Sequence, residues 1–124
     1  MDERFGSDCR LRKRSEYERV YRHGQRRSTA VVAVILSRSA AEGCGRLGIS
    51  IGRRVGSAVV RNRLKRQLRE LYRRRLRSKV RDLDLVVQVR PVAVGKSLQE
   101  LEMYLCRAIR GQIRRSTARS ELSG

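Results

Sequence analysis

The residues with the clearest chemical potential form a basic run in the middle of the chain. Two neighbouring arginines are followed by an Arg-Asn-Arg triplet and by further basic side chains at helical spacing. The set is Arg53, Arg54, Arg61, Asn62, Arg63, Lys65, Arg66 and Arg69. Guanidinium and ammonium groups at this density bind phosphate oxygens and release counterions. We therefore expect a polyanionic partner. Nucleic acid is favoured over an acidic membrane surface, and a merely solvated basic face is the alternative.

The charge of the whole chain supports this interpretation. Its 124 residues include 31 Lys and Arg against 12 Asp and Glu, a net charge of +19. Residues 53–81 hold thirteen basic residues and one acid, a net of 13 − 1 = +12. Such an excess opposes compaction by self-repulsion, so its concentration in one segment indicates a binding surface. The preference for Arg over Lys fits bidentate phosphate contacts, but a GC-rich genome explains it equally well.

The acids do not suggest an independent nuclease. Such an enzyme needs clustered carboxylates for a metal, or a pair of histidines. Glu70, Asp82 and Asp84 form no ligand motif, and His23 is the only histidine. We expect no catalytic residue and no metal ligand. A small ribosomal protein and a DNA-compacting protein, neither of them an enzyme, are the alternatives to a specific RNA-binding protein. A small ribosomal protein more often has long extensions, and a DNA-compacting protein more often has a spare apolar face for dimerisation.

The remaining composition bears on the compartment. No apolar run approaches the ~20 residues of a membrane span, and the charged segment 1–14 lacks the apolar core of a signal peptide. The three cysteines, Cys9, Cys44 and Cys106, form no C-x-x-C pair. This pattern disfavours a disulfide framework or a zinc site and suits a reducing cytosol. We expect a cytoplasmic protein with no membrane contact and no obligate protein partner.

The first element that must position the basic run is a short helix. Residues 1–14 are predicted to be a flexible basic arm. Ser15 and Glu18 have the spacing of a capping box, and Gly24 is a fitting helix end. Tyr17, Val20 and Tyr21 then share one helix face. This pattern alone favours a core role for both tyrosines over a binding role.

Strands are predicted on both sides of the basic run. Residues 29–37 are apolar and β-branched, as in a strand buried on much of both faces, and 85–89 repeat the pattern. A further short strand near 25–28 is an option. Residues 46–52 alternate, with large apolar side chains on one face and Gly48, Ser50 and Gly52 on the other. The small face either packs closely against a neighbour or is an open surface that a ligand approaches, and the pattern leaves both possibilities open.

Two longer helices complete the prediction. Residues 57–79 carry an apolar stripe that includes Leu64 and Leu68, bordered by basic side chains. A second capping box, Ser97 with Glu100, begins the last helix, and residues 115–124 are expected to fray. The predicted fold is an α/β (α+β) two-layer sandwich in the order helix, strand, strand, long helix, strand, helix. Residues 15–114 form its single domain.

The basic run, with its neighbours, resembles a known family signature. That signature is carried by Arg53-Arg54, Val55-Gly56, Ala58-Val59, Arg61-Asn62-Arg63, Lys65-Arg66 and Arg69-Glu70. The match extends to Glu16-Tyr17, to 46–50 and to 84–91, and covers roughly residues 11–110. The chain therefore resembles the protein component of bacterial ribonuclease P.

The resemblance implies an RNA-binding protein cofactor of a catalytic RNA. The holoenzyme is an endoribonuclease that removes the 5′ leader of precursor tRNA by phosphodiester hydrolysis, with Mg²⁺ bound mainly by the RNA subunit. The partners implied are ribonuclease P RNA and precursor tRNA. The basic set named above would contact RNA. The resemblance also implies a left-handed strand-helix-strand crossover, against the usual rule.

The same resemblance implies a cleft for the leader and marks where this chain departs from the pattern. The cleft residues are Tyr17, Tyr21, Ser50 and Gly52, which favours the open interpretation of the small strand face. Phe is common in relatives at the two tyrosine positions. Many members also carry an aromatic residue in the first long strand, where this chain has Ala33 and Ile35. Such a stacking platform is worth about 1–3 kcal/mol per base.

Overall fold

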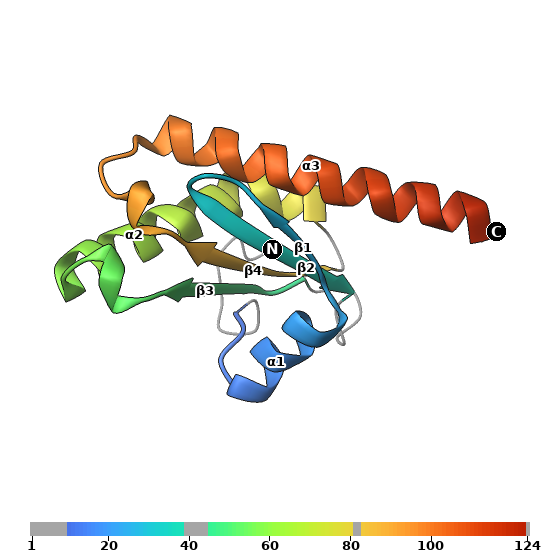
Figure 1. Cartoon of the computed structure of the whole chain (residues 1–124), viewed down its shortest axis with the longest axis horizontal. Coiled ribbons are helices and arrows are strands. Elements are labelled where there is room, and N and C mark those ends of the chain that lie inside the picture. Colours follow the sequence, from blue (N-terminus) through green and yellow to red (C-terminus); the bar gives the residue numbers. More distant parts are fainter. Residues whose placement is uncertain (1–9, 39–44, 81–82, 124) are drawn as a thin grey trace, which may run out of the picture.

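The computed structural model describes residues 10–38, 45–80 and 83–123 of the chain. These residues form a four-stranded sheet and three α-helices (Figure 1). In chain order the elements are α1 (Arg14–His23), β1 (Gln25–Ser28), β2 (Val32–Arg38), β3 (Leu47–Ile51), α2 (Ala58–Leu71), β4 (Leu83–Val89) and α3 (Leu98–Ser123). The α+β class is confirmed, and the optional short strand at 25–28 is present as β1.

The strands lie in the order β1-β2-β4-β3. β2 pairs antiparallel with β1 and with β4, whereas β3 pairs parallel with β4. One row across the sheet consists of Ser28, Ala33, Gln88 and Ser50, each opposite its neighbour. We call this set the polar row. The β3–α2–β4 connection is the expected crossover. Its left-handedness stays a prediction.

Helices cover both faces of the sheet. α2 and α3 pack on one face, where Val34 and Leu36 of β2 join the main core. α1 lies against the other face (Figure 1), where Val20 contacts Ile35 and Val86 in a second, smaller core. α1 therefore adds a partial third layer to the expected sandwich. β2 is buried along both faces, as its apolar composition predicts.

The start of α1 differs from the prediction. The helix begins after Lys13, and Glu16 Oε1 accepts the backbone N–H groups of Arg12 and Lys13, both at 2.8 Å. The expected Ser15–Glu18 capping box is wrong, because Glu18 instead accepts from Arg14 Nε at 3.0 Å. Glu16 is fixed by a contact with the sheet, described below, and this tertiary contact sets where the helix begins.

The segment just before α1 belongs to the domain. The Leu11 N–H donates to the Leu47 carbonyl at 2.9 Å, and the Leu11 side chain is buried. Arg10 forms a parallel β-bridge with Leu47. The end of the expected basic arm is thus ordered against β3, whereas residues 1–9 lie outside the described part of the chain.

The predicted helix over 57–79 is helical along almost its whole length, but the type of helix changes after Leu71. Ser57 Oγ accepts the Val60 N–H at 3.4 Å at the start of α2. A π-helical turn, Tyr72–Leu76, follows Leu71 and gives way to a 3₁₀ turn. The buried Tyr72 hydroxyl donates to the Gly45 carbonyl at 3.3 Å.

The last helix begins as predicted and ends later than predicted. Ser97 Oγ accepts the Glu100 N–H at 3.1 Å, and Glu100 Oε1 accepts the Ser97 N–H at 3.2 Å, so this capping box is confirmed. α3 continues to Ser123, so the backbone of 115–123, expected to fray, is helical. No helix in the described ranges is long and apolar enough to cross a membrane.

Gly24 ends α1 as predicted, but close packing is the reason. Its backbone is extended, with φ −82°. A Cβ there would lie 2.5 Å from Ile35 Cγ2 and 2.5 Å from the Val20 carbonyl oxygen. We expect Gly24→Ala to lower the free energy of unfolding by about 1–3 kcal/mol, because the crowded methyl forces α1 away from β2. Urea unfolding followed by circular dichroism measures this.

The matched control is Gly52→Ala, because a Cβ at Gly52 meets nothing within 4 Å. We expect this variant to unfold at the wild-type urea concentration or slightly above it. Equal stability of the two variants would show that α1 is not held closely against β2.

Candidate nucleic-acid interface

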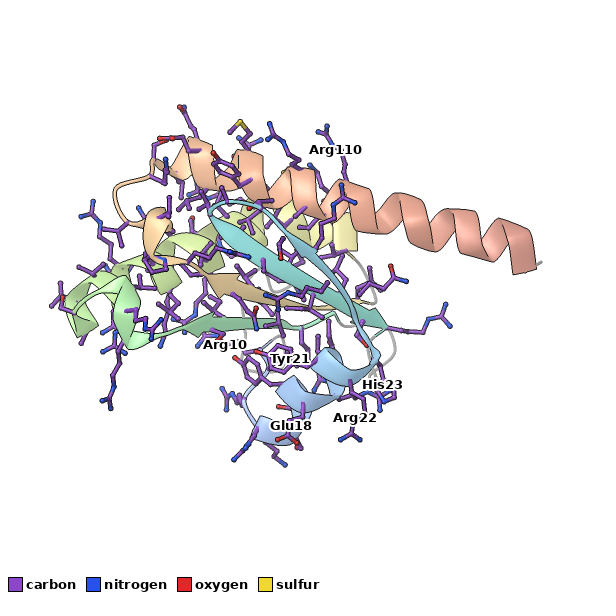
Figure 2. All side chains as sticks on the ribbon, in the orientation of Figure 1. Arg10, Glu18, Tyr21, Arg22, His23 and Arg110 are labelled. Carbon is purple, nitrogen blue, oxygen red and sulfur yellow. The ribbon has the colours of Figure 1, made fainter. Side chains whose placement is uncertain are left out.

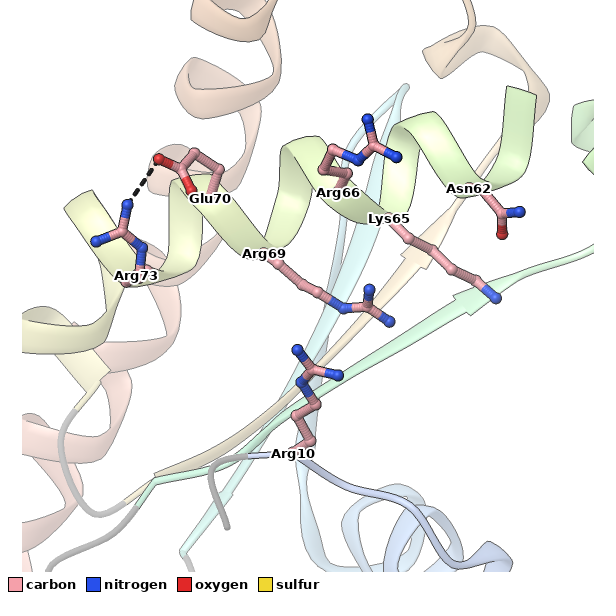
Figure 3. A pocket seen from close by; sticks show the side chains of 7 residues that line it. All are labelled: Arg10, Asn62, Lys65, Arg66, Arg69, Glu70 and Arg73. Atoms are coloured by element: carbon pink, nitrogen blue, oxygen red, sulfur yellow. Dashed lines mark hydrogen bonds and ion pairs between the residues drawn. The ribbon is translucent and has the colours of Figure 1, made fainter. Parts of the chain in front are cut away.

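One flank of α2 gathers basic side chains beside a cavity. Leu64 and Leu68 bury the adjoining side of the helix in the main core. The cavity has a volume of about 530 Å³ and is lined by Arg10, Asn62, Lys65, Arg66, Arg69, Glu70 and Arg73. We call it the basic pocket (Figure 3). Helical spacing explains the α2 members, because residues three, four and seven apart share a flank.

The basic pocket carries an excess of positive charge. Five of its seven lining residues are basic, and its acid, Glu70, accepts from Arg73 Nη2 at 2.8 Å. Glu70 also pairs with Arg74 Nε at 2.6 Å, and the hydrogen bond from Arg73 lowers the pKa of this carboxyl. Burial lowers the pKa of the Arg69 guanidinium, and the nearby charge of Arg10 lowers it further. Cations gathered in this way attract an anionic ligand.

A second, smaller cavity adjoins the basic pocket. It has a volume of about 130 Å³ and is lined by Arg10, Leu11, Tyr17, Leu47, Ile49, Lys65 and Arg69. We call it the tyrosine pocket. It shares Arg10, Lys65 and Arg69 with the basic pocket, so the two form one surface along the edge strand β3. A single-stranded nucleic acid needs such a combination of cationic groups with an aromatic ring.

Tyr17 is both a packing residue and a lining residue. A Cβ on Gly48 would lie 2.6 Å from a ring carbon of Tyr17, so the ring rests directly on the strand. Burial raises the pKa of the Tyr17 hydroxyl above its ordinary value. The sequence left two interpretations of the small strand face open, close packing or an open surface, and each holds for part of that face. Gly48 permits close packing, whereas Ser50 is half-buried and nothing covers the Cβ position of Gly52.

Tyr21 is the more accessible of the two tyrosines. Its side chain is 42% exposed, on the side of α1 that faces the sheet (Figure 2). Because Tyr21 lies one helical turn after Tyr17, the two rings are neighbours on one side of the helix. The core role that the spacing favours holds partly for Tyr17 and does not hold for Tyr21.

The predicted basic set divides into two groups. Asn62, Lys65, Arg66 and Arg69 line the basic pocket. Arg53, Arg54, Arg61 and Arg63 do not line it. Arg63 is exposed, and Arg61 and Arg63 point to different flanks, because two helical residues turn by about 200°. Arg53 and Arg54 are exposed in the 3₁₀ turn η2 (Arg53–Val55) between β3 and α2.

Two pocket residues fall outside the predicted set. Arg73 has a sequence signal, because it follows Arg69 by four residues on the same helical run. Arg10 has none, because it reaches the pocket only through the bridge between its segment and β3. Within the described residues, no three His, Cys, Asp or Glu side chains lie close enough to hold a metal ion.

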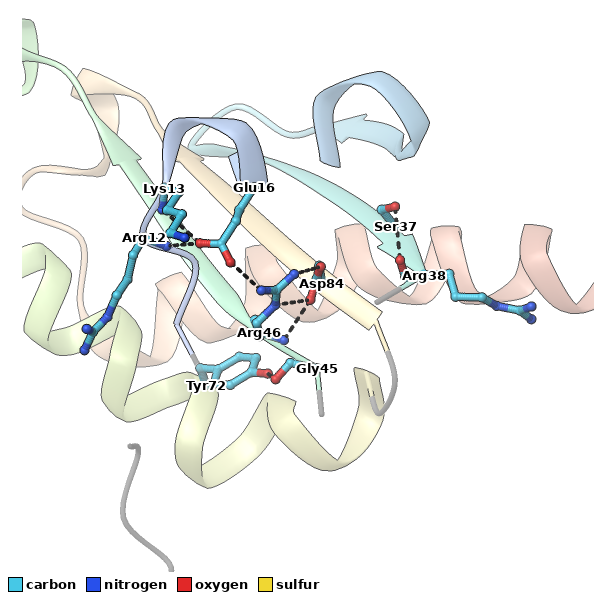
Figure 4. Close-up of polar contacts among 9 residues, drawn as sticks. All are labelled: Arg12, Lys13, Glu16, Ser37, Arg38, Gly45, Arg46, Tyr72 and Asp84. Carbon is cyan, nitrogen blue, oxygen red and sulfur yellow. Dashed lines mark hydrogen bonds and ion pairs between the residues drawn. The ribbon is translucent and has the colours of Figure 1, made fainter. Parts of the chain in front are cut away.

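An ion-pair network holds α1 in place on the sheet (Figure 4). Arg46 donates through Nη1 to Glu16 Oε2 at 2.5 Å and through Nη2 to Asp84 Oδ2 at 3.0 Å. Asp84 is 1% exposed at the start of β4, and its Oδ1 accepts the Arg46 backbone N–H at 3.1 Å. The network joins α1, the start of β3 and β4, and so fixes Tyr17 beside the pockets.

Comparison with known proteins identifies the family. The family model for ribonuclease P matches residues 5–112. The chain belongs to the ribonuclease P protein family. Membership implies a role in tRNA 5′ processing together with an RNA subunit.

Individual relatives agree with this assignment. The ribonuclease P protein component of Dictyoglomus thermophilum is 37% identical over 81% of this chain and 80% of its own length. The ribonuclease P protein component of Acidothermus cellulolyticus is 39% identical over 77% of this chain and 80% of its own length. The RNase P protein of Staphylococcus aureus has a TM-score of 0.75 at 25% identity, covering 82% of this chain and 93% of its own. The RNase P protein of Thermotoga maritima has a TM-score of 0.72 at 26% identity, covering 82% of this chain and 96% of its own.

The Arg46 network predicts an acid-sensitive position for α1. The backbone N–H groups of Lys13 and Arg12 lower the pKa of Glu16, and the charge of Arg46 lowers it further. A carboxyl with a lowered folded pKa stabilises the protein above its unfolded value, and this stability is lost as pH falls through the folded pKa. We expect Glu16→Gln to lower the melting temperature at pH 7 and to reduce its fall below about pH 5.

Glu18→Gln is the control, because Glu18 pairs only with an exposed Arg14 side chain among the contacts described. Its melting temperature is expected to follow the wild-type pH profile. A Glu16→Gln profile parallel to the wild type would contradict a stabilising role for the network.

Proposed function

We propose that this chain is the RNA-binding protein cofactor of the ribonuclease P ribozyme. It binds the catalytic RNA subunit and contacts the unpaired 5′ leader of precursor tRNA. Phosphodiester hydrolysis takes place on the RNA, which holds most of the Mg²⁺. The observation that carries this proposal is the continuity of the basic pocket with the tyrosine pocket along β3.

The basic pocket supports binding to structured RNA. Asn62, Lys65 and Arg66 project donors from one helical flank, and such donors suit phosphate oxygens and ribose 2′-hydroxyl groups. The exposed Arg53, Arg54 and Arg63 extend the positive surface beyond the pocket. Contacts of this kind fix position and carry little sequence information, which suits a protein that acts on many different precursors.

The α1 face of the sheet supports contact with the leader. Tyr17 lines the tyrosine pocket, and Tyr21, one helical turn further along α1, is exposed, so both rings can stack on unpaired bases. Ser50 of β3 and Gly52, just after the end of β3, offer little side-chain bulk, so an extended backbone can approach closely. A leader lying here places its phosphates toward the cations that the two pockets share.

The chain's acids support placing the catalytic chemistry on the RNA. Glu16 and Asp84 are engaged with Arg46, and Glu70 with Arg73 and Arg74. Each of these carboxylates is thus paired with at least one arginine. The Mg²⁺ ions of the reaction are therefore assigned mainly to RNA phosphates in this proposal.

Reconstitution tests the proposal directly. The protein, mixed with a transcribed bacterial ribonuclease P RNA, is expected to accelerate precursor tRNA cleavage at low Mg²⁺, because its cations replace part of the counterion charge. Single-turnover cleavage with and without protein measures this. Cleavage by the protein without RNA would place the chemistry on the chain, and absence of any stimulation would remove the proposal.

The salt dependence of RNA binding tests the basic pocket. Arg66→Ala removes a pocket cation, whereas Arg75→Ala removes an exposed arginine of the following turn that does not line the pocket. We expect Arg66→Ala to weaken binding of the RNA subunit and to reduce the slope of log K against log salt by about 1. Filter binding between 50 and 200 mM salt measures both. An equal slope for the two variants would contradict a phosphate contact at Arg66.

A further inference from the structure

Two polar side chains meet on the α1 face of the sheet, outside both pockets. Arg26 of β1 donates through Nη1 to Gln88 Oε1 of β4 at 2.6 Å. β1 and β4 are not neighbours, because β2 lies between them. The hydrogen bond therefore spans a whole strand. We call this contact the Arg26–Gln88 bridge.

Ala33 of β2 permits the bridge. The strand register places Gln88 opposite Ala33 and places Arg26 opposite Ile35, two residues along the same face of β2. Neighbouring strands lie about 4.8 Å apart, so the two side chains meet roughly above β2. A large side chain at position 33 would stand between them. Ala33 is 1% exposed, so the space above it is filled.

The surroundings of the bridge are open on the solvent side. The polar row contains small or polar side chains, and it is one row removed from the Ile35–Val86 row that Val20 covers. Arg26 and Ser28 are exposed, and Ser50 is half-buried. Tyr21 is exposed on the sheet-facing side of α1. The bridge is thus a polar group on the face of the sheet that α1 partly covers.

The chemistry of the bridge favours a nucleobase. A guanidinium group has five N–H donors, and the amide of Gln88 keeps two more once its carbonyl accepts from Arg26. Donors of this kind suit the carbonyl oxygens of a base, and a guanidinium plane stacks on its ring face. The bond to Gln88 holds this plane in place before a ligand arrives, which reduces the ordering cost of binding.

We propose that the Arg26–Gln88 bridge binds one unpaired nucleotide of the precursor tRNA leader. Arg26 contacts the base, and Gln88 is a positioning residue that orients the guanidinium group. This inference rests on the proposed function, in which the leader lies on the α1 face. It adds a specific contact away from the basic helix, on the side of the sheet opposite to α2 and α3.

The test uses the reconstituted holoenzyme and a matched set of variants. Arg26→Lys keeps the charge and removes the planar group, and Gln88→Ala removes the orienting partner. Arg27→Lys is the control, because Arg27 is the next residue of β1 and belongs to the opposite face of the sheet. Dissociation constants are measured for precursor tRNA, for tRNA without a leader, and for precursors with one abasic leader position each.

We expect Arg26→Lys and Gln88→Ala to weaken precursor binding about tenfold and to leave binding of leaderless tRNA unchanged. One abasic position is expected to weaken the wild type and Arg27→Lys by a similar factor, and to have no further effect on Arg26→Lys. Melting temperatures within a degree or two of the wild type would show that the loss comes from contact with RNA.

The outcomes separate this inference from the proposed function. A wild-type holoenzyme that binds leader-bearing and leaderless tRNA equally would overturn both. A wild type that prefers the leader, with all three variants alike, overturns only the bridge contact. Equal weakening of precursor and leaderless tRNA by Arg26→Lys, or a lowered melting temperature that accounts for the loss, would assign the bridge to stability and also overturn the contact.

Discussion

The placement of α1 depends on one arginine shared by two carboxylates. Asp84 is buried at the start of β4, where an unpaired carboxylate would be strongly unfavourable. Arg46 compensates this charge and uses its remaining guanidinium nitrogen for Glu16. Glu16 in turn caps the helix that carries both tyrosines. The helix start, the entry to β3 and the entry to β4 are therefore fixed together, and the position of Tyr17 over Gly48 follows from that.

The basic pocket depends on how the fold brings positively charged side chains together. α2 buries its leucines under the sheet and leaves its basic flank beside the edge strand β3, and the N-terminal segment brings Arg10 to the same place. Folding thus concentrates cations that an extended chain would keep apart. Binding of a polyanion would offset the electrostatic cost of this arrangement, and any such binding would also stabilise the domain.

Local patterns predicted the elements well, and tertiary contacts decided the details. The Ser97–Glu100 box forms as its spacing predicts, because Glu100 uses Oε1 for the Ser97 N–H while Lys96 pairs with the other carboxylate oxygen, Oε2. The Ser15–Glu18 box fails because Glu16 is fixed by Arg46, thirty residues away. Gly48 and Gly52 belong to the same face in the alternating pattern of residues 46–52. The pattern alone therefore cannot distinguish the closely packed Gly48 from the open Gly52. Likewise, Arg26 and Gln88 are 62 positions apart, and only the strand register brings them together.

The pairing of Leu11 with Leu47 has a consequence for self-association. A sheet with two open edges presents unpaired backbone groups to which a second copy can add a strand. Here the N-terminal segment bonds to the outer edge of β3, and the opposite edge strand, β1, is four residues long with two arginines. Edge-to-edge pairing with a second copy of the chain is thereby disfavoured at both edges of the sheet.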